Sequence, residues 1–277
     1  MSLLLPDRLY LSLAPERAVL LRVSGWRPQL LEKRITECAQ TVTETQAAGW
    51  QASLQALASL LAKHVRKGLL KARCSVVLSN HYGRHLLLPV SDASMSDTEI
   101  QALARHCYLE TYGEAAQDWV IQIDAATGLA CAIDPLLLTG LRAACDKAAG
   151  RLVSVQSYFA AGFNAAHQRI GREPSCYVQA EAGRLMMATL RDGSWQRLAA
   201  VSCAHDWTTQ LATHLQREAL LAGWESAPAK TYLFAPDYPH SSVTLDHTQH
   251  LQRLSARALR GYSPMTDGAC AMAASGV

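Results

Sequence analysis

Several signatures that would identify a function are missing from this sequence. It contains no GxxxxGK[ST] or GxGxxG segment, so neither of the usual glycine-rich phosphate-binding loops is present. It has no run of about 18 consecutive apolar residues, which argues against a membrane-spanning helix. Residues 1–6 carry no basic leader and too short an apolar run for a secretory signal, so we expect a protein that stays inside the cell.

Charge and aromatic content are also low. Charged residues make up 18% of the chain and aromatic residues 6%, and the net charge of +3 comes from 26 Lys and Arg against 23 Asp and Glu. We find no basic stripe with stacking aromatics and therefore expect no nucleic-acid binding. The eight cysteines are widely spaced and form no CxxC pair, which favours reduced thiols over a disulfide framework.

Apolar residues, in contrast, are plentiful. They form 49% of the 277 residues, and a chain of this length is near the size at which proteins divide into two lobes. One order of elements appears twice: strand, strand, strand, helix, strand. In the first copy the pattern predicts strands over residues 9–13, 17–23, 29–35 and 74–78, and a helix with one apolar face formed by Trp50, Leu54, Leu57, Leu61 and Val65.

The second copy follows the same order. It predicts strands over residues 176–180, 184–190, 195–201 and 230–235, with Asp192-Gly193 as a hairpin turn and a helix that begins near Asp206 and stops at Gly223. The block between the copies contains further strands and a helix with a capping box that starts at Ser96. We interpret that block as a subdomain inserted in the first lobe.

These patterns predict an organisation for the whole chain. We expect a first lobe over residues 1–156 with an inserted subdomain at about 84–133, a second lobe over residues 157–261, and a flexible tail over residues 262–277. The tail is rich in Gly, Ala and Ser, a composition typical of disordered termini.

Two copies of a three-stranded meander followed by a helix and a strand resemble the actin-like fold, a two-lobed α/β architecture shared by hexokinases and actin. Residues 129–135, the run from Ala149 through Val153 to Ala161, and the strand pair over residues 177–198 are similar to segments of PilM-type pilus assembly proteins. On this basis the chain is identified as a remote member of the PilM, GspL and MshI-like group of type IV pilus and type II secretion proteins.

The resemblance also locates a nucleotide site and shows how it has changed. In an actin-like ATPase, two β-hairpins each bring an Asp-x-Gly to the nucleotide, where glycine lets the backbone approach the phosphates and the carboxylate organises Mg²⁺. The resemblance places Ser12 and Ala14 at these positions of the first hairpin, and Gln179 and Glu181 at those of the second. The glycine pair that accommodates adenosine is replaced by a segment containing Ala235. We therefore expect no cofactor, no metal and no ATPase activity.

Two functions remain open at this point. The first is a cytoplasmic adaptor, held at the inner membrane through its partner, that binds the cytoplasmic segment of an inner-membrane pilus or secretion component. An extended peptide would add to a sheet edge of the first lobe or its insert, including residues 84–90. The second is an ATP-binding ATPase or phosphotransferase of the same superfamily, because a two-residue shift in the alignment would let Glu181 and Gly183 supply an acid and a glycine.

Two groups of histidines suggest metal sites but have simpler interpretations. His81 and His85 have the spacing of two ligands on a helix, although Tyr82 and Gly83 between them predict a turn instead. A second group near the C-terminus supplies three possible ligands without a fourth, and we interpret it as a solvent-exposed helix face. Its members are Asp246, His247 and His250.

A third group resembles a nucleophile, a base and an orienting acid. Cys203, His205 and Asp206 are so close in the sequence that they are poorly placed for a triad, whose members usually meet through the fold. Asp206 is better explained as a helix cap.

Overall fold

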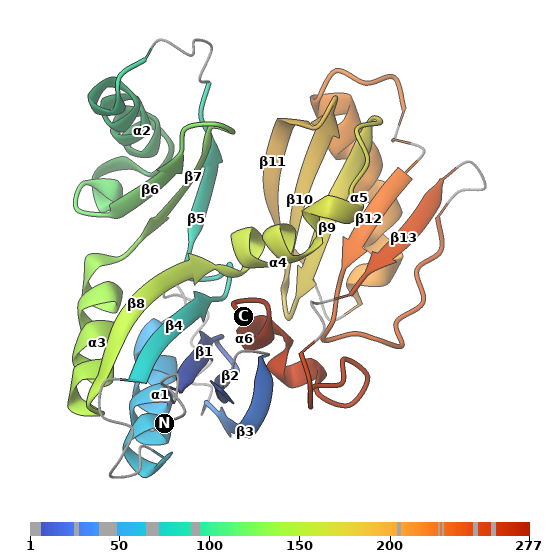
Figure 1. Ribbon diagram of the computed structural model, residues 1–277. Coiled ribbons are helices and arrows are strands. Elements are labelled where there is room, and N and C mark those ends of the chain that lie inside the picture. Colours follow the sequence, from blue (N-terminus) through green and yellow to red (C-terminus); the bar gives the residue numbers. More distant parts are fainter. Residues whose placement is uncertain are drawn as a thin grey trace, which may run out of the picture.

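The computed structural model describes residues 7–24, 28–38, 49–64, 72–89, 95–203, 206–226, 228, 230–245, 249–255 and 259–277. Figure 1 shows two lobes side by side, each with its own sheet, and a smaller sheet above the first lobe. No helix within these ranges is long and apolar enough to cross a bilayer.

The first lobe is built on a five-stranded sheet with the order β3-β2-β1-β4-β8. Its strands are β1 (Arg8–Leu13), β2 (Arg17–Ser24), β3 (Gln29–Glu37), β4 (Ala72–Leu78) and β8 (Gly150–Ser157). Helices α1 (Trp50–His64) and α3 (Pro135–Lys147) pack on one face, where leucines of both helices meet those of β1. Helix α3 begins where Pro135 follows Asp134, whose side chain accepts the Leu136 N–H at 2.8 Å.

The second lobe repeats this topology in the order β11-β10-β9-β12-β13. Its strands are β9 (Ser175–Glu181), β10 (Arg184–Arg191), β11 (Ser194–Ser202), β12 (Lys230–Phe234) and β13 (His250–Leu254), and helix α5 (Trp207–Leu221) packs on its outer face. The predicted turn is present, since Asp192 and Gly193 have φ values of 54° and 78°, the left-handed region that tight hairpins need. The repeated order of elements that the sequence predicted is therefore confirmed.

Strand β13 corrects one prediction. His250, interpreted from the sequence as part of a helix face, begins this strand and pairs with Lys230 of β12 in a parallel register. A five-residue edge strand has too few residues for a clear period, so its pairing comes from β12 rather than from its own pattern. Asp246 and His247, predicted beside it, lie outside the described residues.

The inserted sheet has three strands in the order β5-β7-β6. They are β5 (Arg84–Leu87), β6 (Val120–Asp124) and β7 (Leu129–Ile133), with helix α2 (Asp97–Tyr112) and the 3-10 turn η1 (Gly113–Ala116) beside them. The predicted capping box is present at the start of α2: the Ser96 N–H donates to Glu99 Oε2 at 2.8 Å, and the Ser96 hydroxyl accepts the Glu99 N–H. Ala104 and Tyr108 of α2 fill the small core over this sheet.

Helix α4 (Tyr158–Ala166), which is followed by η2 (His167–Arg169), links the two lobes. It starts directly after β8, where the Ser157 hydroxyl accepts the Ala160 N–H, and runs between the two large sheets (Figure 1). Gly162 allows this close approach, because a Cβ there would lie 2.6 Å from Gln179 Nε2 and 2.9 Å from Phe234 Cε1.

The C-terminal segment is packed, which contradicts the flexible tail predicted over residues 262–277. The 3-10 turn η3 (Gly268–Cys270) and the short helix α6 (Ala271–Ala274) return to the first lobe and contact β1, β2 and β4. Met272 and Ala273 are buried there. Small side chains, which suggested disorder, in fact allow tight packing: a Cβ at Gly276 would meet Val77 at 2.9 Å.

This packing predicts a stability effect for the segment that the sequence predicted to be flexible. Met272 is 2% exposed, so Met272→Ala should lower the free energy of unfolding by about 2–4 kcal/mol through the cavity it leaves. Met265 lies in the same segment but is 58% exposed, and Met265→Ala should change stability by less than about 0.5 kcal/mol. Urea denaturation of both variants checks this. Equal and small effects would contradict a docked C-terminus.

Candidate functional site

The first hairpin, between β1 and β2, touches the opposite lobe. Ser12 and Ala14 are buried, and the tip closes on itself because the Ala14 N–H donates to the Arg17 carbonyl and the Arg17 N–H to the Ala14 carbonyl. The Arg17 guanidinium then reaches across to Asp237, which follows β12, with Nη2 to Oδ2 at 2.5 Å. From the first lobe, the Ser53 hydroxyl donates to the Ala14 carbonyl at 2.9 Å and fixes the hairpin in place.

The second hairpin, between β9 and β10, makes the reciprocal contact. Glu181 at its tip accepts a hydrogen bond of 2.9 Å from the hydroxyl of Ser79, the residue that follows β4. Arg184 donates to the Asn80 carbonyl at 2.7 Å, and His81 Nε2 lies 2.8 Å from the Ala182 carbonyl oxygen. Each hairpin therefore docks on the loop that follows the fourth strand of the other lobe.

Two buried acids give this interface unusual electrostatics. Burial raises the pKa of Glu181 to about 8, although the Ser79 hydrogen bond and Arg184 pull it down. Burial likewise raises the pKa of Asp237 to about 6, against the pull of Arg17. Glu16, in the first hairpin, adds like charge that raises both pKa values. A triphosphate at this interface would meet three carboxyl groups, which repel it where they are ionised.

The remaining positions that the sequence singled out are also buried. Gln179 Nε2 donates to the Tyr158 carbonyl of α4 at 3.0 Å, and Ala235 directly follows β12, where its carbonyl accepts the Tyr238 N–H. Ala14 belongs to the core cluster that includes residues of both lobes, whereas the side chain of Ala235 packs in the separate core beneath α5. Among the described residues, no group of three or more His, Cys, Asp or Glu is arranged to hold a metal ion.

The two histidines with metal-ligand spacing are separated by the fold. His81 lies in the predicted turn and binds the second hairpin, whereas His85 lies on β5 with its ring 5.6 Å from that of Phe159. Burial, with smaller effects of Arg184 and Arg84, lowers the pKa of His85 to about 3, so the imidazole is neutral at pH 7. No local pattern in the sequence indicates that His81 contacts the other lobe.

The triad-like group also has a different arrangement. Cys203 follows β11 and its N–H donates to the Gly183 carbonyl. Asp206 precedes α5, but its side chain accepts the Thr208 hydroxyl rather than a helix N–H, so the predicted side-chain cap is absent. His205 lies outside the described residues.

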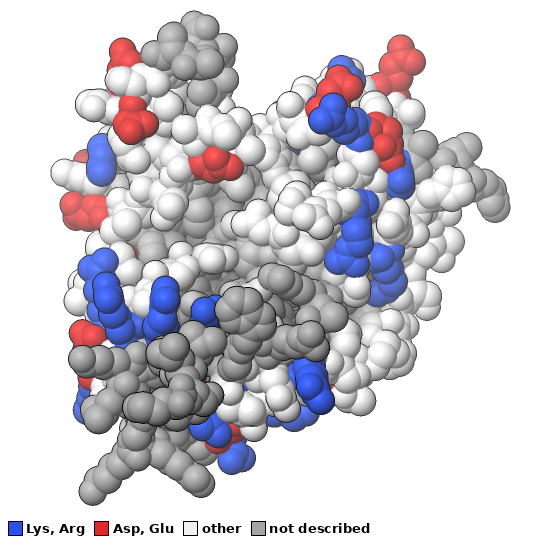
Figure 2. All heavy atoms as spheres, viewed as in Figure 1, with Lys and Arg blue, Asp and Glu red and all other residues white. Residues whose placement is uncertain are grey.

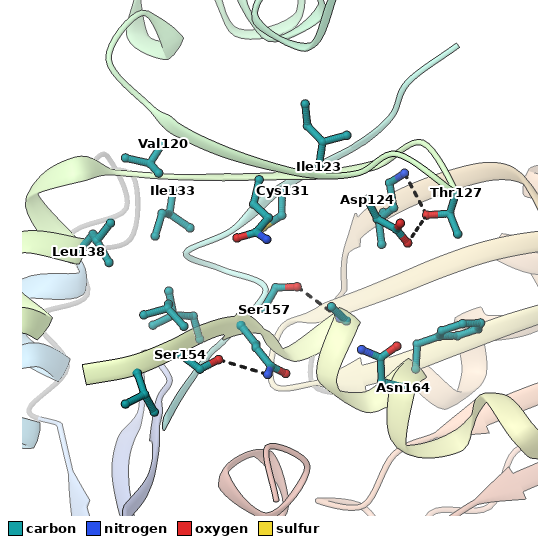
Figure 3. A pocket seen from close by; sticks show the side chains of 18 of the residues that line it. Val120, Ile123, Asp124, Thr127, Cys131, Ile133, Leu138, Ser154, Ser157 and Asn164 are labelled. Carbon is teal, nitrogen blue, oxygen red and sulfur yellow. Dashed lines mark hydrogen bonds between the residues drawn. The ribbon is translucent and has the colours of Figure 1, made fainter. Parts of the chain in front are cut away.

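A groove of about 940 Å³ lies between the inserted sheet and the first lobe. Its upper wall comes from β6 and β7, its lower wall from β8, and Ile133 and Cys131 point from β7 into the space above β8 (Figure 3). β6 and β8 are both edge strands among the strands that the structure describes. The lining is largely apolar, with Arg142 on α3 and Asp124 on β6 as charged groups.

The second lobe and α4 complete the groove. Phe163, Asn164 and His167 form part of its floor, and Trp195 of β11 stands against Phe163 with ring centroids 4.4 Å apart. Helix α4 therefore contributes Phe163 to the groove and Tyr158 to the contact between the lobes.

The sequence indicates the position of this groove only in part. It pointed to the first lobe and its insert, but the strand it named, residues 84–90, corresponds to β5, and no β5 residue lines the groove. β5 occupies the opposite edge of the inserted sheet from β6. The groove is assembled from five separated stretches of chain, and a linear pattern contains no signal for such an assembly.

The buried acid at the second hairpin predicts how stability depends on pH. The folded pKa of Glu181, about 8, lies above its ordinary value of 4.5, so the folded protein retains a proton that the unfolded chain releases between these values. Stability therefore falls as pH rises through this window, by at most about 1.4 kcal/mol per pH unit. The lowered pKa values of His81, His85 and His214 have the opposite effect, which fades over about one pH unit above 6.5, the ordinary histidine pKa.

The window in which Glu181 dominates is thus about pH 7.5 to 8. There the free energy of unfolding of the natural protein should decrease, and Glu181→Gln should remove most of the decrease. Glu225→Gln, at an exposed site after α5, is the matched control and should keep it. Urea denaturation at several pH values measures these slopes, and an unchanged slope in Glu181→Gln would show that Glu181 is not the titrating group.

Comparison with known proteins identifies the fold. No protein-family model and no curated protein matches the sequence. Solved structures do match. One is a chain of the PilM–PilN type IV pilus biogenesis complex, at 16% identity with a TM-score of 0.58, and the match covers 82% of this chain and 80% of that one.

Two further structures are similar over most of their length. The cytoplasmic domain of EpsL, an inner-membrane component of the type II secretion system of Vibrio cholerae, matches at 12% identity with a TM-score of 0.56, over 95% of this chain and 94% of that one. A protein of Bacteroides thetaiotaomicron with an actin-like ATPase fold matches at 10% identity with a TM-score of 0.53, over 83% and 81%. The chain has an actin-like fold, as its sequence predicted.

Proposed function

We propose that this chain is an adaptor of a pilus or type II secretion assembly, which holds an extended cytoplasmic peptide of an inner-membrane component and does not hydrolyse ATP. The observation that carries the proposal is the groove between β6 and β8. It brings two sheet edges and an apolar lining together in one cavity.

The two edges supply the backbone contacts that such a peptide needs. An edge strand presents alternate N–H and C=O groups without strand partners, and an extended peptide can pair with them. β8 is eight residues long and all of its residues from Leu152 to Ser157 line the groove, while β6 contributes Val120, Gln122, Ile123 and Asp124. A peptide strand added to either edge would place every second side chain against an apolar wall.

The charged groups of the lining favour one orientation of the peptide. Leu138 of α3 lies at one end of the groove, and Asp124 lies beside Thr127 at the other end (Figure 3). Arg142 follows Leu138 by about one turn of α3 and also lines the groove. A peptide with an acidic group near Arg142 and a basic group near Asp124 fits these charges, and the reversed peptide meets like charge at both ends.

The similar structures support this assignment of partner. One comes from a complex of PilM with PilN, and another is the cytoplasmic domain of an inner-membrane secretion component. By analogy, the peptide bound here would belong to an inner-membrane protein of the same assembly, and the chain would act at the cytoplasmic face of that membrane.

The contact between the lobes supports the second half of the proposal. Where the resemblance locates the phosphates and the metal, the hairpins instead donate and accept bonds across the lobes, through Arg17 with Asp237 and Ser79 with Glu181. Binding ATP would require breaking buried polar contacts and placing a polyanion among carboxyl groups.

Peptide binding tests the proposal directly. Fifteen-residue peptides that cover the cytoplasmic segments of the inner-membrane pilus and secretion proteins of the same genome should include at least one binder. Val153→Asp places a charge on β8 at a site that is 38% exposed, and should weaken that binding at least tenfold while leaving the unfolding temperature nearly unchanged. Fluorescence anisotropy measures the dissociation constants.

Leu220→Asp provides the control, because Leu220 is 55% exposed on α5 and does not line the groove. It should bind peptide as the natural protein does. The proposal fails if no peptide binds, or if both substitutions weaken binding equally.

A further inference from the structure

Three arginines stand side by side across the sheet of the first lobe. Arg8 of β1 is directly opposite Arg73 of β4, and Arg73 is directly opposite Arg151 of β8. Laterally paired residues share one face of a sheet, and neighbouring strands are about 4.8 Å apart. The three Cα atoms thus form a row about 10 Å long at the start of three parallel strands, which we call the arginine row.

Among the residues that the structure describes, the guanidinium groups of the arginine row have no partner. All three residues are exposed, and no side chain of the three makes a hydrogen bond or ion pair with another described residue. Most other arginines of the first lobe and the interface, such as Arg17, Arg22 and Arg184, are paired. Like charges directly opposite each other on adjacent strands destabilise a sheet, so this row costs stability and contributes nothing visible to the fold.

Acidic and basic residues are unevenly distributed along the molecule. Residues 84–133 contain seven Asp and Glu against two Lys and Arg, whereas the remainder of the chain has an excess of basic residues. The inserted sheet and the starts of β4 and β8 lie at opposite ends of the first lobe (Figure 1). Figure 2 shows acidic side chains gathered over the insert and basic ones over the lower half of this lobe.

We infer that the arginine row is a docking surface for an anionic phospholipid bilayer. A fluid anionic surface needs only exposed cationic groups within reach of its phosphates, and guanidinium groups bind phosphate oxygens in pairs. The acidic insert at the far end turns the molecule so that the row faces the lipid.

An acidic peptide fits the arginine row less well than a bilayer does. Specific binding of a peptide needs pockets for its side chains. The groove described above includes none of these arginines in its lining. The last turn of α3, which precedes β8, adds Asp146 and Lys147, whose charges cancel, so the row itself carries the attraction.

This inference does not depend on peptide binding in the groove, and vesicle co-sedimentation of the full chain tests it. The protein should sediment with vesicles of equal parts phosphatidylglycerol and phosphatidylcholine, but not with phosphatidylcholine alone, and 500 mM NaCl should release it. The double variant Arg73→Ser/Arg151→Ser should partition onto the charged vesicles about 30-fold less strongly, because each arginine removed lowers the partition coefficient about fivefold. Its unfolding temperature should be unchanged or higher, because a like-charge pair is removed.

A second double variant controls for net charge. Arg105→Ser/Arg217→Ser removes two exposed arginines from α2 and α5 and should change partitioning by no more than about twofold. Equal losses in the two double variants, or equal partitioning to charged and neutral vesicles, would overturn the inference.

Two competitors distinguish a bilayer from other anions. Inorganic phosphate should release the protein no better than NaCl of the same ionic strength, and poly-glutamate should bind more weakly than the charged vesicles. Specific release by phosphate would make the row a site for free phosphate, and tighter binding of poly-glutamate would make it a site for acidic polypeptide. Either result contradicts lipid docking.

Discussion

The two lobes are joined by polar contacts at the tips of two hairpins, and the other features of the molecule are arranged around this junction. Arg17 reaches Asp237 from the first hairpin, and Glu181 receives Ser79 at the second. These groups are largely removed from water, so separating them would leave buried charge and unpaired donors, which costs several kcal/mol. The lobes are therefore held together by side chains at the place where the actin-like resemblance locates a nucleotide.

Helix α4 connects this junction to the groove. Its Tyr158 carbonyl is bound by Gln179, its Gly162 lets the second sheet approach closely, and its Phe163 supports Trp195 at the groove floor. The inserted sheet contacts the second lobe where β5 meets β11. Trp195 of β11 also lines the groove, so both lobes contribute walls to one cavity. A fixed relation between the lobes keeps the groove open and its two strand edges aligned, which is the state that an adaptor for an extended peptide requires.

Much of the fold could be read from the sequence, because its main elements have strong local signals. Local periodicity or local backbone geometry is enough to predict several of its features. These are the paired meanders, the capping box at Ser96, and the turn at Asp192 and Gly193. The positions singled out for the nucleotide pocket are all buried, but their contacts across the lobes carry no local signal. The C-terminal segment was mistaken because its Ala and Gly residues, which have weak local preference, are held by tertiary packing against Val77 and its neighbours.

The features that depend on lateral register were not predictable. The groove joins stretches from residue 78 to residue 195, and the arginine row joins residues from three strands that are far apart in the sequence. The partner of Arg17 is likewise 220 positions away. No spacing rule relates such residues, because their proximity follows from the order and alignment of strands in the assembled sheet.

The claim that side chains, and not a nucleotide, join the lobes is tested most directly by titrating the protein with Mg·ATP while its thermal unfolding is followed. We expect no shift in the unfolding temperature up to millimolar ATP. A ligand present at about 100 times its dissociation constant would stabilise the fold by about 2.7 kcal/mol, and for a chain of this size that raises the unfolding temperature by about 5 °C or more. A saturable shift of that size that requires both Mg²⁺ and ATP would contradict the account.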